Sequence, residues 1–176
     1  MSTYKTLILG GVRSGKSQLA ERLASASGLP VTYIATATAQ DDEMRARIAA
    51  HRAHRPDHWQ LIEEPLQLAT VLHACADTGC CVLVDCLTLW LTHLLMTDDT
   101  QALERERAAL LDALPGLPGK IILVGNETNM GITPLGVLAR RYCDEAGMLH
   151  QALAQRCDRV ILTVAGLPHT LKGEPV

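Results

Sequence analysis

Aromatic residues are nearly missing from this chain, which has two tryptophans, three tyrosines and no phenylalanine among its 176 residues. Hydrophobic residues make up 48% of the chain, so a packed core is expected and intrinsic disorder is excluded. That core must consist mainly of leucine, valine, isoleucine and alanine. The length fits one compact domain over residues 1–176.

The sequence also has no hydrophobic stretch long enough to cross a bilayer. Its longest apolar run, CLTLWLTHLLM at Cys86–Met96, is too short and too polar to span one. The opening residues MSTYKTLILGG lack the long apolar stretch of a signal peptide. We therefore expect a cytoplasmic protein without a membrane span.

Zinc-type cysteine spacing is absent, because no C-x-x-C pair occurs among the six cysteines. In the reducing cytoplasm these residues are expected to be reduced and mostly buried thiols. A basic excess is absent as well: the formal net charge is −3 and the isoelectric point is near 6.1. This balance argues against general nucleic-acid binding, which needs a basic surface.

Short apolar runs alternate with helical patterns along the chain. The predicted strands are Lys5–Gly10, Val31–Thr36, Cys80–Asp85, Lys120–Glu127 and Arg159–Gly166. The predicted helices are Ser17–Gly28, Asp41–Arg55, Ala102–Leu114 and Gly136–Cys157, the last with a break near Gly147. This pattern predicts an α/β fold with a mainly parallel sheet and helices on both faces. Ligands of such sheets bind beyond the carboxyl ends of the strands.

The segment GGVRSGKS contains the pattern G-x-x-x-x-G-K-S between a predicted strand and a predicted helix. Glycines let the backbone turn its N–H groups toward phosphate oxygens, and the helix N-terminus adds a positive dipole. In this phosphate-binding loop (P-loop), Lys16 should reach the β- and γ-phosphates and Ser17 should coordinate Mg²⁺. The predicted nucleotide-binding residues are Gly10, Gly11, Val12, Arg13, Ser14, Gly15, Lys16 and Ser17.

Asp85 ends the apolar run VLVD and is predicted to be the second Mg²⁺ ligand, although a capping aspartate is the alternative. The P-loop motif alone does not identify the reaction, since kinases, ATPases, GTPases and nucleotide switches all contain it.

The stretch RARIAAHRAHRPDHW concentrates four arginines and three histidines at residues 45–59. On a helix, Met44, Ile48 and His51 share one face, which puts His51 at the border of the core. Neighbouring arginines disfavour the imidazolium form and keep His51 neutral and nucleophilic. A solvated basic helix face is the alternative reading of this charge run.

Several segments together resemble the bifunctional adenosylcobinamide kinase / adenosylcobinamide-phosphate guanylyltransferase family of cobalamin biosynthesis. The matching stretches include ILGGVRSGKSQLAE, YIATATAQDDEMRARIAAHRAHRPDHW, IEEPLQL, LVDCLTLWLTHLL, NETNMGITP and LARRYCDEAGMLHQALAQRCDRVILTVAGLP. They follow one another in order and cover most of the chain.

The resemblance implies a RecA-like P-loop fold and two reactions. The first phosphorylates the aminopropanol hydroxyl of adenosylcobinamide with ATP or GTP. The second attaches GMP from GTP to that phosphate and releases pyrophosphate, through a guanylylated histidine that falls on His51. Such a covalent intermediate divides one transfer into two easier displacements.

The resemblance also implies further nucleotide contacts, with Mg²⁺ as cofactor and a homo-oligomer, often a trimer, with sites between subunits. These contacts are Ile34, Ala35, Thr36, Arg52, Ala53, His54, Arg55, Glu63 and Asp85. Glu63 is suited by type to accept two N–H groups from a guanine edge, with a surface loop acid as the alternative.

The chain departs from the family's pattern at two places. Family members usually read N-E-V-G-x-G where this chain has NETNMG, so Thr128 and Asn129 differ. They commonly have N-Q where this chain has His150–Gln151, and we interpret His150 as a conservative polar replacement.

Two other functions remain open from the residues alone. A plain P-loop kinase of a small metabolite needs Lys16, Ser17 and Asp85 but tolerates loss of His51. A non-catalytic nucleotide switch or assembly ATPase binds nucleotide and transfers nothing. A DNA recombinase is disfavoured by the net charge.

Overall fold

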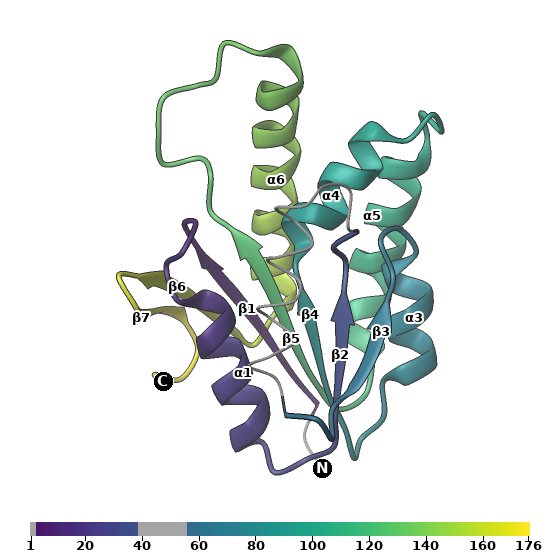
Figure 1. Ribbon diagram of the computed structural model, residues 1–176, viewed down its shortest axis with the longest axis vertical. Coiled ribbons are helices and arrows are strands. Elements are labelled where there is room, and N and C mark those ends of the chain that lie inside the picture. The colour runs from purple at the N-terminus through teal and green to yellow at the C-terminus, as the bar shows by residue number, and fades with distance from the viewer. Residues whose placement is uncertain (1–2, 39–55) are drawn as a thin grey trace.

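The strands of the computed structural model, which describes residues 3–38 and 56–176, form one 7-stranded sheet (Figure 1). The order across the sheet is β3-β2-β4-β5-β1-β6-β7. All pairings are parallel except that between β6 and β7. The bounds are β1 (Tyr4–Gly10), β2 (Val31–Ala35), β3 (Gln60–Glu63), β4 (Cys81–Asp85), β5 (Lys120–Asn126), β6 (Arg159–Val164) and β7 (Leu167–Lys172). The predicted mainly parallel sheet is confirmed.

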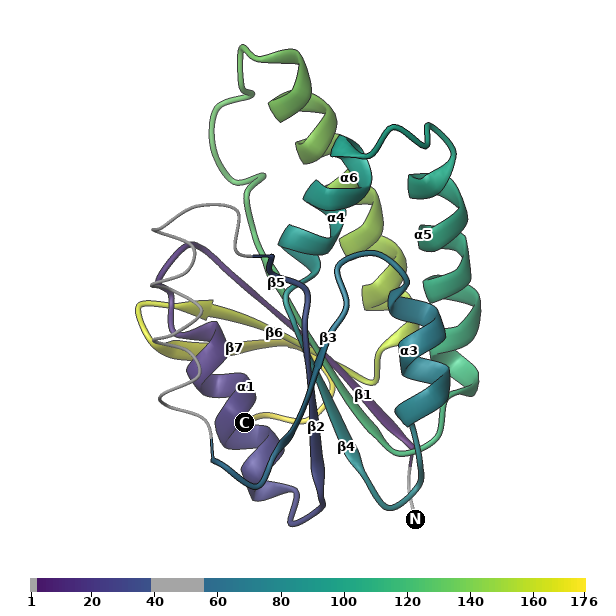
Figure 2. The ribbon, with the colours of Figure 1, turned by 45° about the vertical axis from the view of Figure 1, so that its right-hand side comes forward.

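Helices cover both faces of this sheet, as predicted, but unequally. In the turned view of Figure 2, α1 (Lys16–Ala26) lies on one side of the sheet. The other side carries α3 (Leu68–Cys75), α4 (Leu87–Met96), α5 (Ala102–Ala113) with the 3₁₀ turn Leu114–Gly116, and α6 (Val137–Arg156).

The two core layers follow from the alternation of side chains along each buried strand. In β1, Leu7 and Leu9 face the four-helix side, whereas Ile8 faces α1. Trp59 joins the smaller layer next to α1 and is 9% exposed. The scarcity of aromatic residues therefore leaves both layers mainly aliphatic.

The expected break in the last helix is wrong, because α6 runs unbroken through Gly147. A Cβ at Gly147 would lie 2.9 Å from the Nδ2 atom of Asn129. This glycine therefore admits a side chain from the β5–α6 segment rather than ending the helix. The predicted helix over residues 41–55 lies outside the described residues.

Four elements were not predicted: β3, α3, α4 and β7. β3 has four residues with little burial, and β7 is an exposed edge strand, so neither shows a strong alternation. All six cysteines are free, but only Cys81 and Cys157 are buried, fewer than expected.

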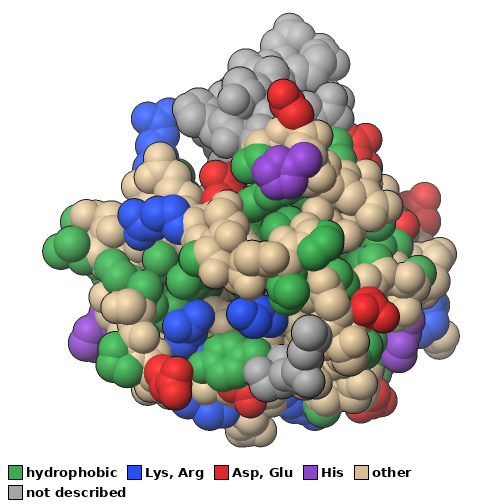
Figure 3. Space-filling model, turned by 90° about the horizontal axis from the view of Figure 1, so that it is seen from below, with side chains coloured by type: hydrophobic (Ala, Val, Ile, Leu, Met, Phe, Trp, Pro, Cys, Tyr) green, Lys and Arg blue, Asp and Glu red, His purple; other side chains and the backbone are tan. Residues whose placement is uncertain are grey.

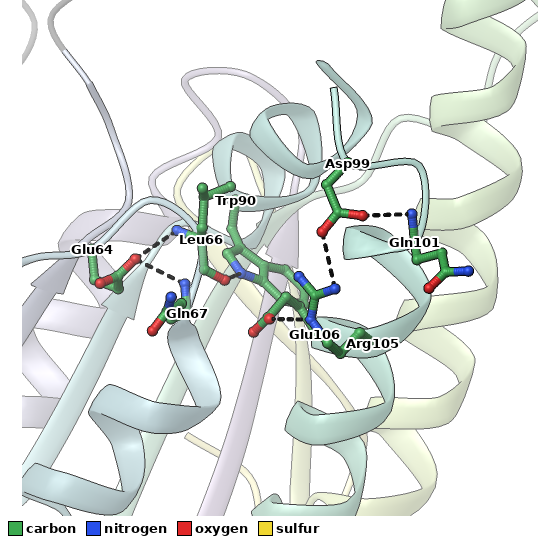
Figure 4. Close-up of polar contacts among 8 residues, drawn as sticks. All are labelled: Glu64, Leu66, Gln67, Trp90, Asp99, Gln101, Arg105 and Glu106. Atoms are coloured by element: carbon green, nitrogen blue, oxygen red, sulfur yellow. Dashed lines mark hydrogen bonds and ion pairs between the residues drawn. The ribbon is translucent and has the colours of Figure 1, made fainter. Parts of the chain in front are cut away.

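The segment between β3 and α3 is fixed by two sets of hydrogen bonds (Figure 4). The Glu64 carboxylate accepts from the backbone N–H groups of Leu66 and Gln67, both at 2.8 Å. The buried indole of Trp90 on α4 donates to the Leu66 carbonyl at 2.7 Å. This contact links the four-helix layer to the end of β3.

No helix in the described part of the chain is long and apolar enough to cross a membrane. On the face where the parallel strands begin, basic and acidic side chains are interspersed with apolar ones (Figure 3).

Replacing Trp90 with phenylalanine removes the indole N–H and leaves the Leu66 carbonyl without this donor. We expect Trp90→Phe to lower the free energy of unfolding by about 1–3 kcal/mol, measured by urea denaturation. Arg105→Ala is the control, since Arg105 is an exposed α5 residue paired with Asp99, and its urea midpoint should not change. Equal midpoints for Trp90→Phe and the wild type would contradict the assigned role of Trp90.

Candidate active site

The P-loop leaves β1 at the carboxyl edge of the sheet and enters α1 at Lys16. Gly15 precedes the helix with φ 93°, in the left-handed region that glycine adopts without strain. The first N–H groups of α1, which have no partner within the helix, lie at this end. The predicted strand–loop–helix context of the motif is thus confirmed.

Backbone hydrogen bonds attach the loop to the strands on both sides of β1. The Glu127 N–H, just after β5, donates to the Gly10 carbonyl at 3.0 Å. On the other side, the Gly166 N–H donates to the Ser14 carbonyl at 2.8 Å. Both neighbours therefore hold the curvature of the loop.

The absence of a side chain at Gly10 is required by the packing. A Cβ there would lie 2.4 Å from the Ser14 hydroxyl oxygen and 2.6 Å from the Thr163 carbonyl oxygen. Gly11, by contrast, has open space around its Cα, and Val12 and Arg13 are exposed.

Lys16 curls back over the loop. Its side-chain Nζ donates to the Gly11 carbonyl at 3.2 Å, and the residue is only 9% exposed. Burial lowers the pKa of Lys16, while the charges of Asp85 and Cys86 partly oppose this shift. The lysine therefore presents its amine at the inner side of the loop, and Ser17 follows half-buried in the first turn of α1.

Asp85 ends β4 at the same edge, opposite Ala35 on β2 and Val124 on β5. Its Oδ2 atom accepts a hydrogen bond from the Tyr33 hydroxyl at 3.1 Å. The structure thus brings Asp85 within electrostatic reach of Lys16, as the strand-end argument predicts.

Two hydrogen bonds join the end of β2 to Cys86, the residue after Asp85. The Thr36 hydroxyl donates to the Cys86 carbonyl at 2.7 Å and accepts from the Cys86 N–H at 2.9 Å. Ile34 is fully buried in the core, and Ala35 is half-buried beside Asp85. Glu63 lies exposed at the end of β3, opposite Ala35.

Comparison with known proteins identifies the family of the chain. Residues 6–171 match the family model described as cobinamide kinase / cobinamide phosphate guanyltransferase. The chain is 66% identical over 172 residues to the bifunctional adenosylcobalamin biosynthesis protein CobP of Pseudomonas aeruginosa, covering 98% of this chain and 99% of that protein. It is 40% identical to the bifunctional adenosylcobalamin biosynthesis protein CobU of Escherichia coli, with coverages of 94% and 98%.

The chain belongs to this family. It is a bifunctional cobinamide kinase and cobinamide phosphate guanylyltransferase of adenosylcobalamin biosynthesis, and the family suggested by the sequence is confirmed.

Solved structures confirm the RecA-like P-loop fold class. The RadB recombinase structure has a TM-score of 0.51 at 19% identity, covering 90% of this chain and 73% of that one. A Pyrococcus horikoshii protein of project PH0250 has a TM-score of 0.56 at 11% identity, with coverages of 98% and 87%. At these identities the likeness is one of fold alone.

Part of the expected family site lies outside residues 3–38 and 56–176. The residues concerned are His51, Arg52, Ala53, His54 and Arg55. The chain enters that stretch from Thr38, whose hydroxyl lies 3.0 Å from the Nε2 atom of His93 on α4.

Two polar residues at this edge were noted in the sequence without a role. Glu127 directly follows β5 beside the P-loop, and His150 of α6 lies buried behind it. The sequence offered one sign that Glu127 belongs to the site, because it is a polar residue directly after an apolar strand. Nothing in the sequence placed His150, because its distance from Glu127 depends on how α6 packs.

We expect Gly10→Ala to destabilise the nucleotide-free protein by about 1–3 kcal/mol, because the methyl group meets the Thr163 backbone and the Ser14 hydroxyl. Thermal unfolding without nucleotide measures this change. Gly11→Ala is the matched control, since a Cβ there has no atom within 4 Å, and its melting temperature should stay at the wild-type value. Equal melting temperatures for both variants would refute the packing argument.

Proposed function

We propose that the P-loop holds the triphosphate of ATP or GTP for the kinase reaction, with Gly10–Ser17 as the nucleotide-binding residues. The observation that carries this proposal is the buried Lys16 amine held 3.2 Å from the Gly11 carbonyl at the start of α1. A phosphate oxygen arriving there would meet this lysine, loop N–H groups and the helix N-terminus together. Lys16 then acts catalytically by stabilising the charge on the transferred phosphoryl group.

We also propose Mg²⁺ as the cofactor, with Ser17 and Asp85 as its protein ligands. A hydroxyl and one carboxylate suit an ion that usually retains waters and binds substrate phosphates. Within residues 3–38 and 56–176 no group of three or more His, Cys, Asp or Glu could hold a metal ion. Ser17 and Asp85 would hold the ion together with the phosphates of the nucleotide, where it would neutralise phosphate charge.

For the second reaction we propose His51 as the nucleophile. Its ring nitrogen forms a bond to the α-phosphorus of GTP while the bond to the departing pyrophosphate breaks. The phosphate of the cobinamide phosphate then attacks the same phosphorus, and the histidine leaves. We also propose further nucleotide contacts, and the positions of Ala35, Thr36 and Glu63 at adjoining strand ends support them. The proposed contacts are Ile34, Ala35, Thr36, Arg52, Ala53, His54, Arg55 and Glu63.

The domain organisation, oligomeric state and location of the enzyme are also proposals. We propose a single domain over residues 1–176, supported by the one sheet, in a cytoplasmic homo-oligomer without a nucleic-acid partner. Exposed apolar side chains along the β6–β7 edge support association: Val164, Leu167 and Leu171 are 58%, 71% and 56% exposed. The resemblance implies a trimer, and sedimentation equilibrium measures the subunit number.

The covalent mechanism predicts that GTP labelled at the α-phosphate transfers its label to the protein in the presence of Mg²⁺. The label should survive denaturation, be labile in acid and stable in alkali, and be absent from His51→Ala. Lack of label on a wild-type protein that still binds GTP would contradict the covalent histidine and favour the plain kinase or the switch.

The metal assignment predicts that Asp85→Asn raises the Mg²⁺ concentration needed for half-maximal phosphorylation of cobinamide by about tenfold or more. Asp77→Asn is the matched control. Asp77 lies before β4, and its Oδ1 atom accepts from the Gly79 N–H, a bond that asparagine retains. An unchanged Mg²⁺ requirement in Asp85→Asn would remove Asp85 from the metal site.

We propose that the corrinoid lies against the segment between β5 and α6, which projects from the carboxyl edge in Figure 1. Met130, Ile132 and Leu135 are 75%, 97% and 95% exposed there, and the corrinoid is a large, partly apolar substrate. Replacing Ile132 with serine should raise the KM for cobinamide several-fold and leave protein labelling by GTP unchanged. An unchanged KM in Ile132→Ser and Leu135→Ser would exclude this surface.

A further inference from the structure

The Nδ1 atom of His150 is buried and makes no hydrogen bond in the structure. His150 is 8% exposed on α6, and its Nε2 atom lies 3.2 Å from the position of a Cβ on Gly125 of β5. The ring therefore packs on the backbone of β5 where glycine leaves room. A buried polar atom without a partner is unusual and calls for a physical explanation.

The nearest ionisable partner of that atom is Glu127. The distance from His150 Nδ1 to the Glu127 Oε2 atom is 3.9 Å, and the Glu127 side chain is 16% exposed. This is about 1 Å too long for a hydrogen bond, so a small rotation of the carboxylate would close it. Burial lowers the pKa of His150 and the Glu127 charge opposes that shift, which leaves the ring neutral at pH 7.

The other oxygen of Glu127 is already held. Its Oε1 atom accepts the Asn129 N–H at 2.7 Å, and the Asn129 side chain donates to the Cys143 carbonyl of α6 at 3.0 Å. Asn129 thus contacts Glu127 from the loop, and His150 faces it from α6. One carboxylate oxygen is therefore fixed by the loop, and the other faces His150.

Glu127 also lies beside the P-loop, where we propose that the triphosphate binds. Its N–H donates to Gly10 at the start of the P-loop, and β5 separates the P-loop strand from the strand that ends in Asp85. Tyr142 of α6 lies in the same region. Burial raises its pKa to about 12, and the nearby Cys86, Cys143 and Glu127 also raise it. The phenol is thus neutral at pH 7, whereas Glu127 offers a carboxylate between the P-loop backbone and His150 of α6.

We propose that Glu127 accepts the proton of the cobinamide hydroxyl in the kinase reaction, and that His150 is a positioning residue for Glu127. The inference rests on the proposed placement of the triphosphate in the P-loop. The hydroxyl oxygen forms a bond to the γ-phosphorus as the bond to the bridging oxygen breaks, and the nucleoside diphosphate leaves. The hydroxyl proton passes to the Glu127 carboxylate and from there to water.

Three assays on the full-length enzyme separate this role from a general defect. The first measures phosphoryl transfer from γ-labelled ATP and GTP to cobinamide. The second measures labelling of the protein by α-labelled GTP, and the third measures GMP transfer to supplied cobinamide phosphate. Only the first reaction removes a proton from the substrate alcohol, so the other two serve as internal controls.

Glu127→Gln keeps an oxygen for the Asn129 N–H but loses the basic carboxylate. We expect the kinase kcat to fall about 10²- to 10⁴-fold, with the nucleotide KM changed less than about threefold and the two guanylyl reactions unchanged. Glu104→Gln, an exposed acid in the first turn of α5, is the matched control and should behave as the wild type. Glu127→Asp keeps a carboxylate and should lose less activity than Glu127→Gln.

For His150, asparagine retains an amide donor, whereas alanine does not. We expect His150→Ala to lower the kinase kcat about tenfold or more without changing the nucleotide KM, and His150→Asn to restore most of the loss. Similar kinase activity in the two variants would overturn the positioning role.

Kinase kcat retained within threefold in Glu127→Gln overturns the proposal. Equal loss of all three activities in a folded Glu127→Gln also overturns it, by assigning Glu127 to nucleotide binding. If Glu127→Gln does not fold, Glu127→Ala decides, since a kinase kcat retained within threefold without any carboxylate at this position contradicts proton transfer to Glu127. Failure of the wild-type protein to take label from GTP would instead count against the proposed covalent mechanism, not against Glu127.

Discussion

The close packing of backbone against backbone around the P-loop is the constraint on which the rest of the edge depends. Gly10 lies against Ser14 and the Thr163 carbonyl with no room for a methyl group. The loop is bonded to the ends of β5 and β6 through Glu127 and Gly166. Because the ends of β5 and β6 hold this loop, the backbone fixes Glu127 beside the P-loop, at the same edge of the sheet where β4 ends in Asp85.

The strand order also bears on the two transfers that we propose for one small domain. β4, β5 and β1 end side by side with Asp85, Glu127 and the P-loop, the residues proposed for phosphoryl transfer. β2 and β3 end beyond Asp85 with Thr36 and Glu63, and the chain leaves β2 toward the segment that contains His51. In the proposed scheme the two reactions therefore draw on neighbouring strand ends.

The parts of this fold that sequence predicted are those governed by local chemistry. The apolar runs of β1, β4 and β5 and the glycines of the P-loop have few alternatives. β3 and β7 were missed because edge strands carry little burial, and Gly147 was misread because its reason is the distant Asn129. The pairing of His150 with Glu127 likewise depends on helix packing, which no local pattern reports.

The P-loop lies at residues 10–17, yet strands much later in the sequence complete it. Gly10 pairs in register with Asn126 on one side and Thr163 on the other. During synthesis the loop therefore emerges early and stays without its supports until almost the whole chain has left the ribosome. Long-range parallel pairing of this kind forms slowly, so the nascent protein acquires its nucleotide site as one of its last steps.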